Sequence, residues 1–385
     1  DGALFLDNSG INNTNRLAGA LPGITFQGGT FRFIGHNGAA AGEELGVATF
    51  NGGASTIDMI NGLGAGSSAE LRFSAAALGG GTINFSASNG TLGAPGDNPR
   101  VYFNSGLTLG AIVPYATVGR APAFYDATYG IRAYTLDEGV EFDGTSLAQD
   151  TIDTIYTAAN NHLPLIAAKT NNSIWIDNPG NGYAVDLSTN VLTITSGRIM
   201  LTGNDDFEFV RNSGNMGILG GTRYYVDVSG PGVTLRLGVP IGTGNNAVSK
   251  DGDGTLVFDA ASTFTGGLII NDGLVQYGAN GDLGINPLVI WGDGVFDMSG
   301  KTDTLGAVTI LTGFLTNSAE LGELTIGSLS LGGMPAGVPA RVDTGSGMLK
   351  LGGTVTYASG NDPETAVITG TLDLNGATRT FAVYN

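Results

Sequence analysis

The sequence predicts an all-β protein, and more specifically a parallel β-helix (a β-solenoid) with a lateral loop excursion. The first observation is composition: of 385 residues 65 are glycine, 42% are hydrophobic and only 13% are charged. That mixture is too apolar for a disordered chain and too rich in glycine for helices. The second is that short runs of β-forming residues, each about as long as a typical strand, recur along the chain. The third is that glycines and Asn-Gly pairs, which tolerate positive φ, separate these runs.

The runs alternate between apolar and polar side chains, which assigns one face of each expected strand to the interior. In TFRFIG, Phe31 and Phe33 share a face opposite Arg32, and in GTLVFD, Leu256 and Phe258 share a face, as period-two alternation requires. The runs in the first half are ALFLD at 3–7, TFRFIG at 30–35, STIDMI at 55–60, ELRFS at 70–74, TINFS at 82–86 and RVYFN at 100–104. Those in the second half include SIWID at 173–177, VLTIT at 191–195, YYVDV at 224–228, VTLRL at 233–237, LVIWG at 288–292 and LTIGSLSL at 324–331.

So many short strands fit either a sandwich or barrel of hairpins or a solenoid of stacked coils. Hairpin proteins favour two-residue loops between paired strands, whereas the spacers here vary in length and no bounded block of domain size is visible. The pattern therefore favours a solenoid with roughly 20–25 residues per coil. We expect solenoid coils over 1–110 and 173–385, separated by an irregular, aromatic-rich excursion over 111–172.

The stretch 111–172 departs from the pattern of strands and turns. The spacing of Ile152, Ile155 and Tyr156 predicts a short helix within it, over 146–160. Its aromatic side chains either stack on sugars or partner surfaces, or anchor the excursion to the solenoid, and we favour anchoring. The candidate surface-binding aromatics are Tyr115, Phe124, Tyr125, Tyr129 and Tyr134.

One stretch, 250–284, carries an ordered set of repeat-like residues. It reads KDGDGTLVFDAASTFTGGLIINDGLVQYGANGDLG, and this order resembles the autotransporter-associated β-strand repeat, also called the passenger-associated transport repeat. The matching residues are Lys250, Gly252, Gly254, Thr255, Leu256, Phe264, Gly266, Gly267, Gly273, Leu274, Leu283 and Gly284. The resemblance implies an extracellular protein of the bacterial cell surface whose repeats form a right-handed parallel β-helix as a stalk or passenger. It supplies no catalytic residue.

Charge and cysteine content exclude several classes of function. The chain has 34 acidic and 16 basic residues, a formal charge of −18, so it repels nucleic acid and anionic membranes. No apolar run reaches the roughly 20 residues that span a bilayer, and the absence of cysteine excludes disulfides, thiol catalysis and cysteine-ligated zinc. The chain begins at Asp1 without the features of a signal peptide, so we interpret it as a processed or excerpted piece of a longer polypeptide.

Two acidic clusters are the residues most reminiscent of catalysis. Polysaccharide-cleaving enzymes use paired carboxylates, and such residues gather in LDEGVEFDG at 136–144 and in GNDDFEF. In the second cluster, alternation places Phe207 and Phe209 inside and Asp206 and Glu208 on the solvent side. A solvated acidic face explains both clusters, and we predict that the protein is not an enzyme.

Histidines and turn carboxylates give no convincing site either. His36 and His162 lie far apart in the sequence, and neither belongs to a catalytic or zinc-binding motif. Asp251, Asp253 and Asp282 offer oxygen ligands of the kind that calcium prefers, but turn formation explains them. We therefore predict no cofactor, with calcium as the alternative.

The favoured function is structural: one segment or subunit of an extracellular bacterial fibre, stalk or surface appendage, stacking end to end through its terminal coils. A solenoid leaves backbone donors and acceptors unpaired at its end coils, and such edges drive pairing. The expected interface residues are Ala3, Leu4, Phe5, Leu6, Thr380, Phe381, Ala382, Val383 and Tyr384. The expected partners are copies of the chain or neighbouring β-solenoid segments. An adhesin or glycan-binding passenger is the alternative, and a polysaccharide-acting enzyme is third.

Overall fold

The structure is a computed structural model that divides into two compact units, unit 1 (Asp1–Glu138) and unit 2 (Gly139–Asn385). It is all-β: its described residues form strands and turns, with a single 3-10 turn, η1 (Leu136–Glu138), as the one helical element among them. The described residues are 2–14, 16–17, 21–141, 154–156, 163–165, 167–178, 183–210, 218–220, 223–242, 246–281, 283–333, 339–358 and 365–384.

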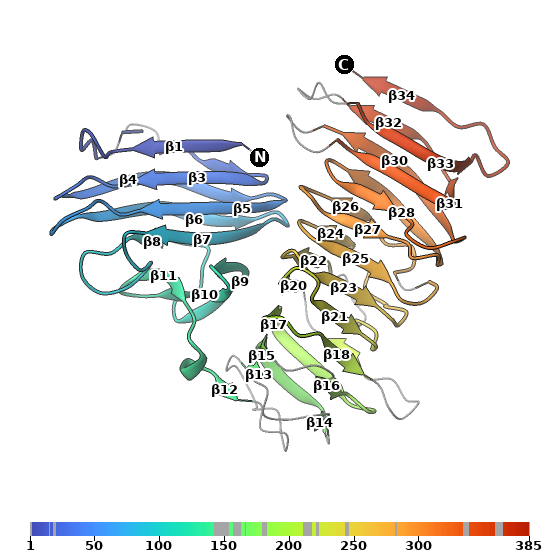
Figure 1. The fold of residues 1–385 in the computed structure, drawn as a ribbon, viewed down its shortest axis with the longest axis horizontal. Coiled ribbons are helices and arrows are strands. Elements are labelled where there is room, and N and C mark those ends of the chain that lie inside the picture. Colours follow the sequence, from blue (N-terminus) through green and yellow to red (C-terminus); the bar gives the residue numbers. More distant parts are fainter. Residues whose placement is uncertain are drawn as a thin grey trace. The chain divides into compact units, whose positions relative to one another are not determined.

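Unit 1 is built from coils that place one strand in each of two parallel sheets (Figure 1, blue to cyan). The first sheet contains β1 (Ala3–Asp7), β3 (Gly29–Ile34), β5 (Ala54–Ile60), β7 (Thr82–Ser88) and β9 (Ala111–Val118). The second contains β2 (Ile24–Phe26), β4 (Ala40–Phe50), β6 (Ser68–Leu78) and β8 (Arg100–Phe103). Because successive strands of one sheet are separated by a strand of the other, the chain winds as a solenoid.

The interior of unit 1 consists of apolar side chains stacked in register along the sheets. Leu4 of β1 aligns with Phe31 of β3, which aligns with Ile57 of β5, and Phe31 and Ile57 are buried. Phe33 is also buried, whereas Arg32 between the two phenylalanines lies on the outer face. The alternation predicted for this strand is confirmed.

The sheet changes direction where unit 1 ends. After β9, strands β10 (Ala121–Asp126) and β11 (Gly130–Ala133) pair antiparallel in a meander. The expectation of an irregular stretch beginning at residue 111 is therefore wrong for β9, β10 and β11. Two of these strands contain proline, Pro114 and Pro122, and proline weakens a strand prediction because it cannot donate a hydrogen bond to a neighbouring strand. The chain divides at Glu138, rather than at residues 110 and 172 as expected.

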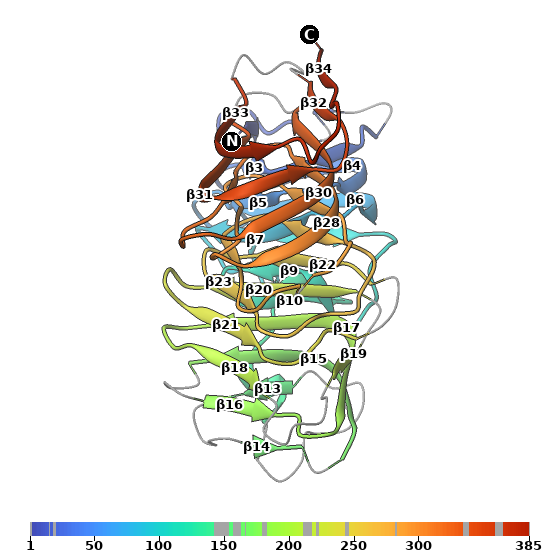
Figure 2. The same cartoon turned by 90° about the vertical axis from the view of Figure 1, so that its right-hand side faces the viewer.

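Unit 2 is a longer stack of parallel strands, and Figures 1 and 2 show it from β14 to β34. One ladder contains β12 (Val140–Glu141), β13 (Thr154–Tyr156), β15 (Lys169–Asp177), β17 (Val191–Thr202), β20 (Tyr224–Ser229), β22 (Val248–Asp251), β24 (Leu268–Ile270), β26 (Leu288–Ile290), β28 (Thr302–Ile310), β30 (Glu323–Gly332), β32 (Val355–Ala358) and β34 (Phe381–Tyr384). The other contains β14 (Leu163–Pro164), β16 (Tyr183–Asp186), β18 (Phe207–Val210), β21 (Thr234–Leu237), β23 (Thr255–Phe258), β25 (Leu274–Tyr277), β27 (Val295–Asp297), β29 (Phe314–Thr316), β31 (Arg341–Leu351) and β33 (Val367–Asp373), and the short β19 (Ile218–Gly220) pairs with β17.

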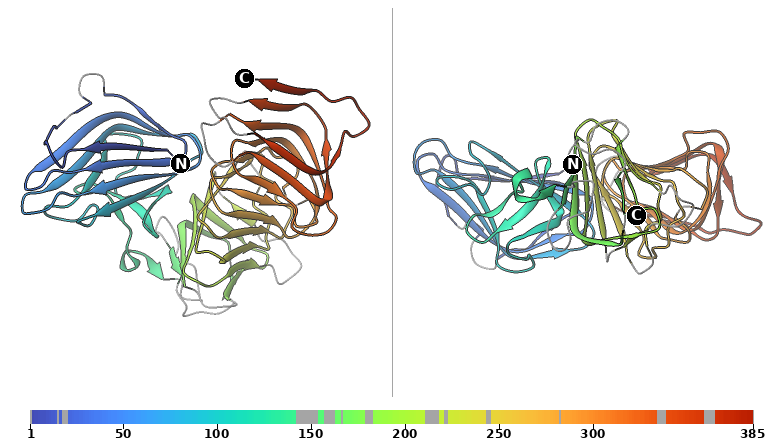
Figure 3. Two further views of the ribbon diagram at one scale, coloured as in Figure 1. Left: turned by 45° about the horizontal axis from the view of Figure 1, so that its top comes forward. Right: turned by 90° about the horizontal axis from the view of Figure 1, so that it is seen from below.

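The coils of unit 2 repeat at a regular length where the core is most uniform. Val248, Leu268, Leu288 and Val308 align in one column, each 20 residues after the last, and all four are buried. The strands of these coils run parallel across the stack (Figure 3). The predicted parallel solenoid and its coil length are thus observed in this part of the chain.

The helix predicted over 146–160 falls largely outside the described residues. The three described residues within it, Thr154–Tyr156, form β13, which pairs in parallel with β15. In the described part of the chain, no helix is long and apolar enough to cross a membrane.

Candidate functional site

β1 is the outermost strand of its sheet, and among the described residues no strand pairs with its far edge. The amide of Thr30 donates to the carbonyl oxygen of Gly2 at 2.9 Å. A parallel ladder uses the backbone groups of alternate residues, so the groups of Leu4 also face β3. The N–H and C=O groups of Ala3 and Phe5 therefore face outward, where a further strand could pair with them.

The side chains of β1 leave the end of the unit 1 core partly uncovered. Leu4, which belongs to the interior column, is 51% exposed. On the outer face, Phe5 is 52% exposed and carries the guanidinium of Arg32 at 5.2 Å from its ring centre. One group of the edge is already occupied, since the guanidinium of Arg16 donates to the carbonyl oxygen of Asp7 at 2.9 Å.

β34 is the outermost strand at the other end of the chain, in unit 2. The amide of Val355 donates to the carbonyl oxygen of Thr380 at 2.9 Å, so by the same alternation the backbone groups of Phe381 and Val383 face away from β32. Their side chains are 52% and 72% exposed, and that of Tyr384 is 60% exposed. β34 therefore presents both unpaired backbone groups and a large apolar surface.

The nine interface residues expected from the sequence all lie on these two edges. Eight are in β1 and β34, and Thr380 directly precedes β34. Leu6 differs from the rest because it is only 6% exposed. The two strands belong to different units, so they are two edges and not one site.

The opposite end of unit 1 is closed by the meander of β9, β10 and β11. Phe103 lies in β8, the outermost strand of the second sheet, which pairs only with β6 among the described strands. The hydroxyl of the buried Tyr125 accepts a hydrogen bond from the amide of Phe103 at 2.9 Å and donates to the carbonyl oxygen of the same residue. One side chain thereby satisfies both outward groups of this edge residue.

Glycine allows the meander to approach the same edge closely. Gly130 has φ +76°, and a Cβ atom there would lie 2.3 Å from the carbonyl oxygen of Val101. A hydrogen bond of 2.9 Å from the hydroxyl of Tyr102 to the carbonyl oxygen of Thr128 adds a second connection between β8 and the meander.

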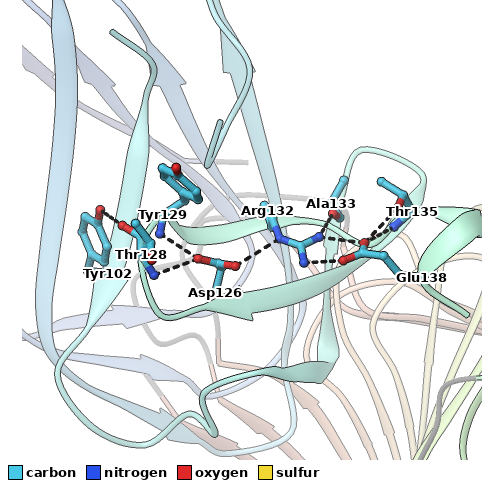
Figure 4. A network of polar contacts seen from close by, with 8 residues as sticks. All are labelled: Tyr102, Asp126, Thr128, Tyr129, Arg132, Ala133, Thr135 and Glu138. Carbon is cyan, nitrogen blue, oxygen red and sulfur yellow. Dashed lines mark hydrogen bonds and ion pairs between the residues drawn. The ribbon is translucent and has the colours of Figure 1, made fainter. Parts of the chain in front are cut away.

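A polar network fixes the last turn of unit 1 to the meander (Figure 4). Arg132 forms a two-pronged ion pair with Glu138, at 2.8 and 2.5 Å, and its Nε lies 3.6 Å from Asp126. The carboxylate of Glu138 also accepts hydrogen bonds from the amide and hydroxyl of Thr135, both at 2.9 Å. The hydrogen bonds from Arg132, helped by those from Thr135, lower the pKa of Glu138 to about 2.

Three of the five candidate surface-binding aromatics are buried, and the other two are half-buried. Tyr115, Tyr125 and Tyr134 are buried, at 8%, 5% and 5% exposure. Phe124 is half-buried beneath the guanidinium of Arg132, 4.3 Å from its ring centre. Tyr129 is half-buried as well, with a guanidinium 5.8 Å from its ring centre. The arrangement favours anchoring over binding for the three buried tyrosines, Tyr115, Tyr125 and Tyr134.

Lys250, the first residue of the repeat-like stretch, is completely buried in unit 2. Its position in the ladder aligns with Ile270 of the interior column. Its ammonium group donates to the carbonyl oxygens of Asp251, Gly252 and Asp272, at 2.8, 2.6 and 3.2 Å. Burial lowers the pKa of Lys250 to about 8, against the opposing influence of nearby carboxylates.

The glycines around Lys250 explain the spacing of the stretch in physical terms. Gly252 and Gly273 have φ of +76° and +69°, and a Cβ atom on Gly273 would lie 2.7 Å from the Lys250 ammonium and 2.2 Å from the Gly252 carbonyl oxygen. The lysine thus needs glycine at 273, in the turn of the next coil, whereas Gly252 is needed for its positive φ and for its approach to the carbonyl oxygen of Val228, 2.5 Å from a Cβ placed there. Sequence reasoning found this pattern but not its role, because motif order does not reveal which side chains point inward.

The acidic cluster in GNDDFEF forms the solvated strand that was expected. Phe207 and Phe209 are buried, Asp206 is exposed and Glu208 is half-buried, which confirms the predicted alternation. The carboxylate of Asp206 accepts a hydrogen bond from the amide of Thr234 at 2.7 Å, so it contacts the start of β21 in the next coil.

The other candidates for chemistry have structural surroundings. Asp253 accepts the amide of Gly230 at 2.7 Å, and His36 is half-buried in the turn that follows β3. Within the described ranges, no group of three or more His, Asp or Glu side chains is placed to hold a metal ion. The remaining sequence candidates Asp143, His162 and Asp282 lie outside those ranges.

Comparison with known proteins gives no match: no family model, no curated protein and no solved structure is significantly similar to this chain.

Proposed function

We propose that this chain is a segment of an extracellular bacterial fibre or stalk in which β-solenoid segments stack end to end through β1 and β34. The observation that carries the proposal is that both strands expose at their outer edges what the inner strands bury. Phe381 aligns with Val355, which aligns with Leu329. Val355 and Leu329 are 5% and 1% exposed, whereas Phe381 is 52% exposed.

A covering strand would therefore bury apolar surface and pair backbone groups in one step. Full burial of one large apolar side chain stabilises by roughly 1.5–3 kcal/mol, and partly exposed Leu4, Phe381 and Val383 would each contribute a share. Solenoid edges are natural templates for such addition. The covering strand with the matching chemistry is the edge of another solenoid coil.

The sequence of the two edges supports the same conclusion. Proteins commonly protect an exposed edge strand with lysine, proline or a covering segment. β1 reads ALFLD and β34 reads FAVY, so neither strand contains lysine or proline. The extracellular bacterial setting is supported by the resemblance of 250–284 to a repeat of secreted surface proteins.

The proposal is tested by blocking one edge without disturbing the fold. In Phe381→Pro the lost N–H group faces away from β32, so the ladder inside unit 2 keeps its bonds while the outer edge loses a donor and gains a ring that obstructs pairing. We expect filaments from the unmodified chain in negative-stain electron microscopy, and only single particles from the variant.

Phe381→Leu is the matched control, because it keeps both the amide and an apolar side chain. We expect it to form filaments like the unmodified chain, with both proteins compared at equal concentration by sedimentation velocity. Filaments from Phe381→Pro, or a monomeric unmodified chain at high concentration, would contradict the proposal.

A further inference from the structure

We infer that Lys250 sets the alignment of β22 on β24, and so the register between two successive coils of unit 2. The inference is independent of the proposed function, because it concerns how one coil is placed on the next and holds whether or not the chain assembles into a fibre. It makes Lys250 a positioning residue of the solenoid. Its ammonium group allows the native alignment and excludes the alignment that is displaced by two residues.

The strands that follow β22 carry little information about their own alignment. β24, β26 and β28 each place two branched apolar side chains in the interior, two residues apart. The six buried residues are Leu268, Ile270, Leu288, Ile290, Val308 and Ile310. A shift of two residues keeps every side chain on its own face and exchanges one branched apolar residue for another. The apolar interior therefore does not by itself select between these alignments.

β22 differs because one of its two interior side chains is charged. Val248 and Lys250 align with Leu268 and Ile270 of β24, and both are 0% exposed. A shift that brings Lys250 opposite Leu268 would carry its ammonium group roughly 7 Å along the strand, into the apolar column. A buried charge without hydrogen-bond partners is strongly disfavoured, so lysine excludes this alignment.

The native alignment gives Lys250 partners on both coils. Its ammonium group donates to the carbonyl oxygens of Asp251 and Gly252, at 2.8 and 2.6 Å, in the turn after β22. It also donates to the carbonyl oxygen of Asp272, at 3.2 Å, in the turn after β24. The backbone adds a further bond, from the amide of Asn271 to the carbonyl oxygen of Lys250 at 2.9 Å. The bonds to the second coil exist only when the two turns lie opposite each other.

Gly273 makes room for the ammonium group in the native alignment. A Cβ atom there would lie 2.7 Å from the Lys250 nitrogen and 2.2 Å from the carbonyl oxygen of Gly252. A displacement by two residues would bring Asn271 or Val275 to this place, and both carry side chains. A single buried polar residue fixes the register of some coiled coils in a comparable way. The lysine thus supplies the selectivity that the apolar column lacks.

Disulfide trapping measures the alignment directly, since the chain contains no cysteine. Ser249→Cys with Ile269→Cys reports the native alignment, because these two residues are aligned and aligned Cα atoms lie about 4.8 Å apart. Asp251→Cys with Ile269→Cys reports the displaced alignment. In the native alignment the Cα atoms of this second pair lie about 8 Å apart, beyond the reach of a disulfide, and a shift of two residues aligns them.

Each pair is introduced into the full chain, which is unfolded and then refolded in a glutathione redox buffer. The crosslinked fraction is measured by mass spectrometry of proteolytic peptides. With Lys250 present, we expect the displaced pair to crosslink roughly tenfold less than the native pair. In Lys250→Met, which keeps a long side chain and removes the charge, the displaced crosslink should rise roughly fivefold, as expected when a penalty of about one hydrogen bond is removed.

Ile270→Met is the matched control, because it introduces the same residue at the aligned position of the next coil and keeps Lys250. We expect the displaced crosslink in this variant to equal that of the unmodified background. Far-UV circular dichroism verifies that each variant retains its strands.

Three outcomes would overturn the inference. A displaced crosslink that is equally rare with lysine and with methionine at position 250 would assign the register to the turns alone. An equal rise in Ile270→Met would show that any change in the interior loosens the coil. A Lys250→Met chain that does not fold would show that the lysine serves stability and not alignment.

Discussion

The two ends of unit 1 finish the same pair of sheets in opposite ways. At one end an antiparallel meander turns back, and the hydroxyl of Tyr125 satisfies both outward groups of Phe103. At the other end β1 keeps outward backbone groups at Ala3 and Phe5, and Leu4 is half exposed. The difference teaches that closing the edge of a solenoid takes both a polar partner for the backbone and a cover for the core. Within the described residues, β1 has only one such polar partner, Arg16 at the carbonyl oxygen of Asp7.

The closed end should be the more sensitive of the two to substitution. Tyr125→Ala removes a buried ring and leaves the amide and carbonyl of Phe103 unpaired, so we expect a loss of about 3–5 kcal/mol from cavity formation alone. Tyr125→Phe keeps the ring and loses only the hydroxyl, and we expect a smaller loss of about 1–3 kcal/mol. Urea unfolding followed by far-UV circular dichroism measures both.

Tryptophan fluorescence supplies an internal control for this experiment. Both tryptophans, Trp175 and Trp291, are buried in unit 2, so their signal reports unfolding of that unit. An equal stability of Tyr125→Phe and the unmodified chain would show that the hydroxyl does not close the edge.

Lys250 satisfies backbone groups in the interior of unit 2, as Tyr125 does at the closed end of unit 1. Its ammonium group donates hydrogen bonds to three carbonyl oxygens. Its pKa is lowered to about 8 in the folded state, below the unfolded value of about 10.4, so between these values the unfolded chain binds more protons. Stability of the unmodified chain relative to Lys250→Met should therefore rise with pH across this window, by on the order of 2–3 kcal/mol.

The measurement is the difference in urea midpoint between the two chains at several pH values from 7 to 11, followed by tryptophan fluorescence. Comparing the pair cancels the titration of groups that both chains share. A difference in urea midpoint that is constant with pH would mean that burial does not lower the pKa of Lys250.

The smallest expected effect concerns the ion pair between Arg132 and Glu138 at the closed end of unit 1. The pKa of Glu138 is about 2 in the folded state and lies near 4.5 in an unperturbed carboxyl, so its contribution is complete above pH 4.5 and is lost as pH falls towards 2. Because the carboxylate is one-third exposed, we expect a contribution of about 1 kcal/mol or less. In Glu138→Gln, the loss of stability between pH 4.5 and pH 2, measured by circular dichroism melts, should be smaller. An unchanged loss would show that the ion pair with Arg132 does not stabilise the closed end.

Much of the fold could be predicted from the sequence because a strand with one apolar and one polar face shows alternating apolar and polar residues. The runs at 55–60 and 324–331 lie within strands, the run at 30–35 extends one residue beyond its strand, and the faces assigned to Phe31 and Phe207 were correct. β4 was missed because AAGEELGVATF is rich in small residues and carries two glutamates, one of which, Glu43, is buried where it accepts backbone amides.

The candidate site was predictable in part for a related reason. The strands β1 and β34 could be predicted because ALFLD and FAVY are rich in β-forming apolar residues. The closing role of Tyr125 depends on which strand lies opposite its hydroxyl, and that contact spans 22 residues. The inward direction of Lys250 likewise depends on the register between coils, which a single sequence does not specify.

The column of Val248, Leu268, Leu288 and Val308 defines a coil of 20 residues as the unit by which the chain can lengthen or shorten in evolution. Because equivalent positions recur every 20 residues with side chains of similar size, a gene segment encoding one coil can be duplicated or lost while the remaining side chains keep their faces. A loss of half that length would bring corner residues onto strand positions. The length of such a protein can therefore change in steps of one whole coil without disturbing the interior of the remaining coils.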